Sequence, residues 1–124
     1  MTKILVVDDE ATVRDMVSSM IEPLGCEVTV AGNGLEAIAA CKAHAFDLVI
    51  TDIVMPGKNG IDLIMQLKKD YPSTHVLGIS GGGGGITGRY DYLEIAQLVG
   101  ADNILRKPFS MKDMRDAVSK LLNL

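Results

Sequence analysis

Four short apolar segments of the sequence end in residues that can bind a metal ion and a phosphoryl group. Asp8 and Asp9 follow "KILVV", and Asp52 follows "DLVIT". Ser80 closes the segment "HVLGIS", and Lys107 follows "NILR". Carboxylates are ligands for a hard divalent cation, and an ammonium and a hydroxyl can contact phosphate oxygens. The residue types therefore indicate chemistry on a phosphoryl group beside a divalent cation.

Three carboxylates in one place repel one another, and each pair at ~4 Å costs about 4 kcal/mol at an effective dielectric constant of 20. A bound Mg²⁺ removes that cost, because it prefers one or two carboxylates together with phosphate oxygens. A carboxylate can also be the nucleophile and form an aspartyl phosphate. Asp52 is the candidate for this role, since it stands alone at the end of its segment.

Each of these residues also has an ordinary structural interpretation. Asp8 and Asp9 can be acids at a helix N-terminus, where negative charge is favourable. Asp52 alone can be a turn residue, and Lys107-Pro108 can be the entry to a helix. The functional interpretation is favoured because the four apolar segments, if they are strands of one parallel sheet, deliver suitable groups to the same edge of that sheet.

The elements that must position these residues alternate along the chain. Continuous apolar runs predict buried strands, the alternation at residues 27–31 predicts a half-exposed edge strand, and apolar residues at helical spacing predict amphipathic helices. We expect strands at residues 3–7, 27–31, 47–51, 75–80 and 103–106, and helices at 10–24, 33–44, 60–70, 90–99 and from 110 onward. Five strand–helix units predict an α/β domain with a parallel sheet and helices on both faces. Ligands then bind outside the carboxyl ends of the strands, where the strand order reverses.

The helix patterns also predict which side chains face the core. In the first helix the expected inward residues are Val13, Met16, Val17, Met20, Ile21 and Leu24. In the second they are Leu35, Ile38 and Ala39. Pro23 and Gly25 are expected to end the first helix, and Ser110 to cap the last one.

Composition excludes several classes of protein. The chain has 124 residues, 48% of them hydrophobic, which suits one domain with a substantial core. A net charge of −4 argues against non-specific nucleic-acid binding and against a role at a membrane surface. The N-terminal segment lacks the long apolar region of a signal peptide. Cys26 and Cys41 form no C-x-x-C motif and indicate buried thiols in a reducing compartment, so we expect a cytoplasmic protein.

Three segments together carry a family resemblance that covers essentially the whole chain. "ILVVDDE", "DLVITDIVMPGKNGIDL" and "GADNILRKPF" resemble the receiver domain of bacterial two-component response regulators. The resemblance implies a flavodoxin-like (βα)5 fold in three αβα layers, with the five-stranded parallel sheet in the order 2-1-3-4-5. It also implies that residues 1–124 form a single receiver domain, with no output domain in this chain. Such a receiver either works alone, as chemotaxis and relay receivers do, or is cut from a longer protein.

The resemblance implies a role for each matching acid. Asp52 would be the phosphoacceptor. Asp9, Asp52 and the backbone carbonyl of Val54 would be Mg²⁺ ligands, and Asp8 would hold the metal through water.

The resemblance also assigns the groups around the phosphoryl site. Ser80, Gly81 and Lys107 would contact the phosphoryl group, with Ser80 as the switch hydroxyl. The Lys107–Pro108 bond would be cis.

The partners follow from the same resemblance. The phosphoryl donor would be a phosphohistidine on a sensor histidine kinase or a phosphotransfer protein. The output would leave through the face of the fourth helix, fifth strand and fifth helix, with neither nucleic acid nor membrane as a direct partner. The protein would be an enzyme only in catalysing its own phosphorylation and slow dephosphorylation. Two alternatives remain open: a degenerate receiver that acts as a binding module, and a flavodoxin-like flavin carrier. The second is disfavoured by an aromatic content of 4% and the absence of Trp.

The sequence departs from the family pattern at several positions. Ile104 stands where an aromatic switch residue is usual. Val54 and Gly82 occupy the two positions that tune phosphoryl lifetime, and neither can orient an attacking water, which favours slow self-dephosphorylation.

The glycine run 81–85 allows three interpretations: a nucleotide cradle, a loose connection, or a mobile gate beside Ser80. Residues 83–88 match G-x-G-x-x-G, but they follow the fourth strand, whereas a dinucleotide site has this motif after the first. The gate is the favoured interpretation, because glycines widen backbone freedom.

Overall fold

A computed structural model describes residues 1–53, 60–80, 96–97 and 99–124 of the chain. Expectations that fall on Val54, Gly81, Gly82, the glycine run and most of the helix at 90–99 lie outside the described residues. The described elements are β1 (Lys3–Val7), α1 (Ala11–Ile21), η1 (Glu22–Leu24), β2 (Glu27–Ala31), α2 (Gly34–Ala43), β3 (Leu48–Asp52), α3 (Gly60–Asp70), β4 (His75–Ser80), β5 (Asn103–Arg106) and α5 (Met111–Leu122).

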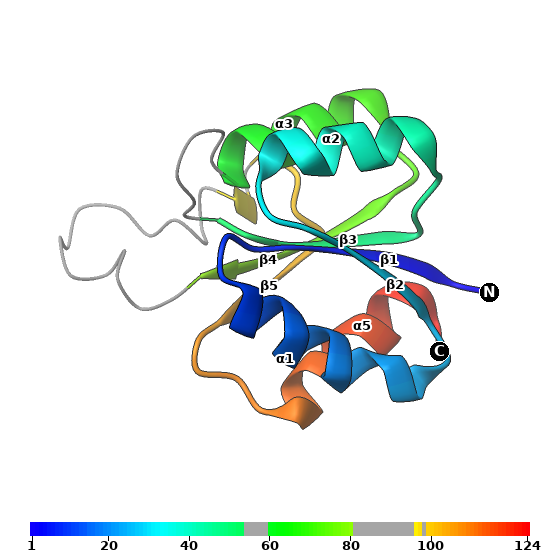
Figure 1. Cartoon of the computed structure of the whole chain (residues 1–124), viewed down its shortest axis with the longest axis vertical. Helices are drawn as coiled ribbons and strands as arrows, with labels where there is room; N and C mark the ends of the chain where they lie inside the picture. Colours follow the sequence, from blue (N-terminus) through cyan, green and yellow to red (C-terminus); the bar gives the residue numbers. More distant parts are fainter. Residues whose placement is uncertain (54–59, 81–95, 98) are drawn as a thin grey trace, which may run out of the picture.

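The sheet has five parallel strands in the order β2-β1-β3-β4-β5. Helices α2 and α3 cover one face and α1 and α5 cover the other, so the molecule has three layers (Figure 1). The predicted fold class and strand order are confirmed. The strand order reverses between β1 and β3, which are direct neighbours, and their carboxyl ends therefore open into the same crevice.

Alternation along the central strands builds one core on each side of the sheet. Leu5 and Val7 of β1 belong to the core under α2 and α3, whereas Ile4 and Val6 belong to the core under α1 and α5. Successive strand residues point to opposite faces, so a strand buried on both sides must be apolar throughout. The residues Ile4, Leu5, Val6 and Val7 meet this requirement.

Local signals end and begin the helices as expected. Helix α1 passes into the 3-10 turn η1 at Glu22–Leu24, which contains Pro23 and is followed by Gly25 at φ 83°. Ser110 caps α5 by accepting a hydrogen bond from the Asp113 backbone N–H, 3.0 Å away. These features confirm the predicted end of the first helix and the predicted cap of the last.

The predicted inward faces need correction in two helices. Leu35 is 73% exposed and Ala39 is exposed, because the buried stripe of α2 consists of Gly34, Ala37, Ile38 and Cys41. Leu35 and Ala39 lie to one side of that stripe at 100° per residue. In α1, Met16 is also exposed, although its neighbour Val17 is buried.

Two further sequence expectations can be compared with the described residues. Cys26 and Cys41 are both buried and free, as predicted. Among the described residues, none of the helices is long and apolar enough to span a membrane.

Candidate functional site

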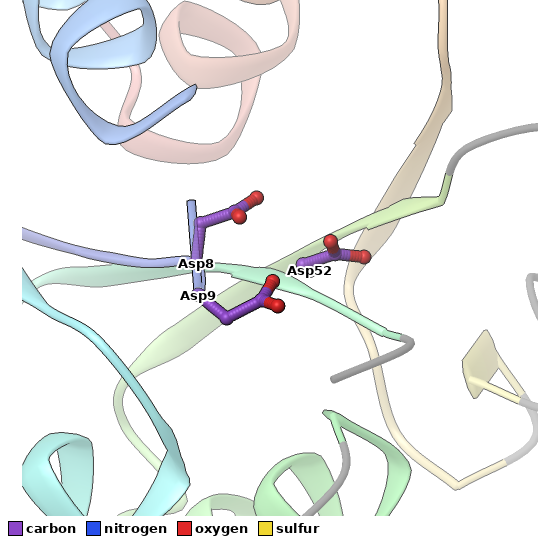
Figure 2. Close-up of side chains that lie close together, drawn as sticks. All are labelled: Asp8, Asp9 and Asp52. Carbon is purple, nitrogen blue, oxygen red and sulfur yellow. The ribbon is translucent and has the colours of Figure 1, made fainter. Parts of the chain in front are cut away.

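Three carboxylates meet at the carboxyl edge of the sheet, where β1 and β3 end side by side. Val7 pairs with Thr51, so the next residues, Asp8 and Asp52, are neighbours. One ligand oxygen from each of Asp8, Asp9 and Asp52 lies within 4.8 Å of the other two. Figure 2 shows the three side chains extending from these adjacent strand ends. Asp8 and Asp52 are buried and Asp9 is exposed, so the cluster is open to solvent on the Asp9 side.

Lys107 brings a positive charge to the same cluster from the end of β5. Its Nζ lies 3.6 Å from Oδ2 of Asp52 and 3.8 Å from Oδ2 of Asp8. The Lys107 backbone N–H donates to the carbonyl oxygen of Ser80, 2.8 Å away. The Lys107–Pro108 peptide bond is cis, as predicted.

Ser80 is the last residue of β4 and is 5% exposed. Asp52 of β3 pairs with Ile79 of β4, and Ser80 directly follows Ile79. The structure therefore brings Asp8, Asp9, Asp52, Ser80 and Lys107 to one edge of the sheet.

Burial and charge perturb the acidity of Asp8. The pKa of its carboxyl group is raised from 3.8 to about 6, mainly by burial and also by the negative charges of Asp52 and Asp9. The hydrogen bond from the Glu10 N–H, 2.9 Å from Oδ1, and the charge of Lys107 act in the opposite direction. A buried carboxyl beside like charges is stabilised by any added positive charge.

The donor set of the cluster fits a divalent metal ion. All its ligand atoms are carboxylate oxygens, which Mg²⁺ prefers, and Asp9 leaves the site accessible. Three ionised carboxylates and one ammonium would carry a formal charge of −2, which one divalent cation balances. The residues that the sequence singled out as metal ligands are thus placed together, apart from Val54, which lies outside the described residues.

Sequence reasoning missed the part that Gly60 plays beside the site. The Gly60 N–H donates to the Ile53 carbonyl, 2.8 Å away. A Cβ at position 60 would lie 2.2 Å from the Asp52 carbonyl oxygen and 2.4 Å from the Ile53 Cα. Only glycine allows α3 to begin this close to the backbone of Asp52. A glycine at the predicted start of a helix is the sequence feature that could have indicated this close approach.

Sequence reasoning also missed two side chains that hold backbone near the ends of the strands. Arg14 donates from Nη1 to the carbonyl oxygen of Asp8, 2.7 Å away. At the opposite edge of the sheet, Oδ2 of Asp102 accepts from the Val76 N–H at 2.7 Å and from Lys68 Nζ at 3.0 Å. Neither contact has a sequence signature, because each depends on a backbone group whose direction the fold sets.

The fold and the site define the class of protein. A doubly wound parallel sheet carries a cluster of three aspartates, with a lysine beside it, at the edge where its strand order reverses. The model of the response regulator receiver domain matches residues 4–119. The chain belongs to this family, and its acidic cluster is typical of the receiver metal site.

Curated relatives include longer regulators. The chain is 34% identical over 114 residues to the probable transcriptional regulatory protein TcrX of Mycobacterium tuberculosis, covering 90% of this chain and 45% of TcrX. It is 35% identical over 120 residues to the DNA-binding transcriptional regulator NtrC of Azospirillum brasilense, covering 97% of this chain and 24% of NtrC. The chain thus spans less than half the length of either relative.

Solved structures agree with this assignment along the whole chain. The receiver domain of NtrX from Brucella abortus superposes with a TM-score of 0.87 at 33% identity, covering 97% of this chain and 98% of that one. The chemotaxis response regulator CheY4 of Vibrio cholerae gives a TM-score of 0.84 at 28% identity, covering 98% of both chains. The family and fold predicted from the sequence are therefore confirmed.

Proposed function

We propose that the protein is a phosphoaccepting switch in two-component signalling, with Asp52 as the phosphoacceptor. The observation that carries this proposal is the position of the Asp52 carboxylate. It lies within 4.8 Å of the carboxylates of Asp8 and Asp9 and 3.6 Å from the Lys107 ammonium. The donor is a phosphohistidine on a sensor histidine kinase or a phosphotransfer protein.

In the transfer, an Asp52 carboxylate oxygen forms a bond to phosphorus while the phosphorus–nitrogen bond of phosphohistidine breaks. The electron pair of the broken bond stays on the imidazole nitrogen of the donor. Asp9, Asp52 and the Val54 carbonyl would hold Mg²⁺ directly and Asp8 would hold it through water, and the ion would supply positive charge for the phosphoryl oxygens. Lys107 moves from pairing with the Asp52 carboxylate to pairing with the phosphoryl group that replaces its charge.

The remaining site residues carry the signal. The Ser80 hydroxyl and the Gly81 backbone contact the phosphoryl group, and Ser80 reorients toward it. The changed surface is the face that includes β5 and α5, and a downstream protein binds there. Residues 1–124 form one receiver domain, and we place it in the cytoplasm with protein partners alone.

The test is the intact mass of the protein after incubation with a small phosphoryl donor and Mg²⁺. One added phosphoryl group is expected on the wild type, and none on Asp52→Asn or in EDTA. Asp116→Asn is the matched control, because this exposed acid on α5 lies outside the acidic cluster. Modification of Asp52→Asn to the wild-type level would overturn the proposal. No addition under any condition would instead make the protein a binding module.

The lifetime of the phosphoryl group is a second part of the proposal. Val54 and Gly82 have no polar side chain that could orient an attacking water. Hydrolysis is therefore slow unless a partner assists. A half-life of seconds, measured by the same mass assay without a phosphatase, would contradict this part alone.

A further inference from the structure

Arg14 of α1 lies beside the acidic cluster and contacts its backbone. Its Nη1 donates to the carbonyl oxygen of Asp8, 2.7 Å away, in a partly buried position. The Asp8 N–H donates to the Ala31 carbonyl at 3.2 Å, and the Asp8 carboxylate accepts from the Glu10 N–H at 2.9 Å. Asp8 is therefore held at its N–H, its carbonyl and its carboxylate by three different parts of the chain.

The guanidinium of Arg14 also lies near a second fixed group. The position that a Cβ on Gly32 would occupy is 3.5 Å from Arg14 Nη1 and 3.5 Å from Glu36 Oε2. The Glu36 carboxylate is itself held by the Gly32 N–H at 3.2 Å and by the Asn33 side-chain amide at 3.1 Å. The Arg14 guanidinium and the anchored Glu36 carboxylate thus border the same space beside Gly32.

The carbonyl that Arg14 binds sets the direction of the next residue. It belongs to the peptide unit that joins Asp8 to Asp9, and this unit is planar. Fixing its oxygen fixes the direction in which the chain leaves toward Asp9. Asp9 is exposed, and like charges nearby would drive its carboxylate away into solvent. Keeping it within 4.8 Å of the other two carboxylates therefore requires a restraint on the backbone.

We infer that Arg14 is a positioning residue that holds the Asp8–Asp9 peptide so that both carboxylates face Asp52 before a cation arrives. This inference rests on the proposed function, in which the positioned carboxylates bind Mg²⁺. Lys107 acts differently, since its ammonium contacts the carboxylates themselves at 3.6 and 3.8 Å. Arg14 contacts a neutral carbonyl and acts through geometry.

The experiment compares Arg14→Met, Arg14→Lys and a matched control. Methionine keeps the apolar stem without the donors, whereas lysine keeps one charged donor. Arg115→Met is the control, because Arg115 also donates to a backbone carbonyl, that of Met20 at 2.8 Å, near the other end of α1. Each protein is titrated with Mg²⁺ by calorimetry, and amide hydrogen exchange at Glu10 is measured in EDTA.

We expect the Mg²⁺ Kd of Arg14→Met to rise about tenfold, the size typical of losing a group that orients a metal ligand. Exchange at Glu10 should become faster in the same variant without metal. Arg14→Lys should recover part of both losses, and Arg115→Met should change neither. Wild-type affinity and wild-type exchange in Arg14→Met would overturn the inference alone, as would equal effects in Arg115→Met. A wild-type protein that binds no Mg²⁺ or gains no phosphoryl group would overturn the proposed function and this inference with it.

Discussion

The ammonium of Lys107 lies 3.6 Å from the carboxylate of Asp52, although Asp52 ends β3 and Lys107 follows β5, and these strands are not neighbours in the sheet. Strand β4 separates β3 from β5, so the lysine reaches across its end. The contact places the Lys107 ammonium where negative charge would increase if Asp52 were phosphorylated. It also means that the electrostatics of the cluster can be tested one charge at a time.

We predict opposite changes in the acidity of Asp8 when its two charged neighbours are neutralised. Asp52→Asn should lower the Asp8 pKa from its value of about 6, because the Asp52 charge raises it. Lys107→Met should raise the pKa further, because the ammonium lowers it. Carboxyl chemical shifts followed by NMR against pH in EDTA measure both. Shifts in the same direction for the two variants would contradict the assigned contacts.

We predict that Asp8→Asn stabilises the metal-free protein at neutral pH. The pKa of Asp8 is raised on folding, so the folded protein binds a proton more tightly than the unfolded chain between pH 3.8 and about 6. Stability therefore falls as pH rises through this window, and the loss is complete above it. Because Asp8 is only 3% exposed, Asn should recover up to about 3 kcal/mol at pH 7 to 8.

Urea unfolding of the wild type and Asp8→Asn from pH 3.5 to 8 in EDTA measures this difference. The gain should shrink toward zero at the acidic end, where wild-type Asp8 is protonated in both states. An advantage of the same size at every pH would show that the charge of Asp8 is not its cause.

We predict that Gly60→Ala damages both stability and the site. The new Cβ would lie 2.2 Å from the Asp52 carbonyl oxygen, so α3 or the end of β3 must shift. Overpacking against backbone typically costs about 1–3 kcal/mol, and here the shift would also move Asp52, the proposed phosphoacceptor. Urea unfolding and the mass assay for phosphorylation report the two effects.

Gly32→Ala is the matched control, since its Cβ would meet only side-chain atoms, at 3.5 Å or more. It should leave both measurements near wild type. Wild-type stability and phosphorylation in Gly60→Ala would contradict the close approach of α3 to β3.

We predict that Asp102 anchors the amino end of β4 mainly through a backbone hydrogen bond. Asp102→Ala would leave the Val76 N–H, in a fully buried residue, without its carboxylate acceptor 2.7 Å away, which should cost about 1–3 kcal/mol. Asp102→Asn keeps an acceptor and loses only the negative charge beside Lys68 and His75, so it should cost less. Lys112→Ala, which breaks the exposed pair with Asp116, should have no measurable effect in the same urea unfolding series.

The sequence predicted most of the fold and the five groups at the strand ends, and physical reasons explain both the success and the gaps. The bounds of β1, β2, β4 and β5 came out as predicted. Strands β1 and β4 were recognisable because a strand buried on both faces is largely apolar, whereas β2 and β5 are partly exposed edge strands. The position of Asp52 followed from the end of such a strand.

The errors arose where the hydrophobicity pattern of a helix is compatible with more than one inward face. Leu35 was predicted to face the core because it is large and apolar, yet the small residues Ala37 and Cys41 define the buried stripe of α2. Small residues carry little weight in a hydrophobicity pattern, although they allow close packing. Arg14 and Gly60 were missed because their roles depend on backbone atoms that only the folded chain brings near.

The two cores described for this fold share no residue, since the sheet separates them. Changes of side-chain volume under α1 and α5 therefore need no compensation under α2 and α3. During divergence of the family, the layer that contains α5 can acquire new partner surfaces while the opposite layer keeps its packing. The sheet edge that holds Asp52 is common to both layers, so one acidic site can serve receiver domains with different partner surfaces.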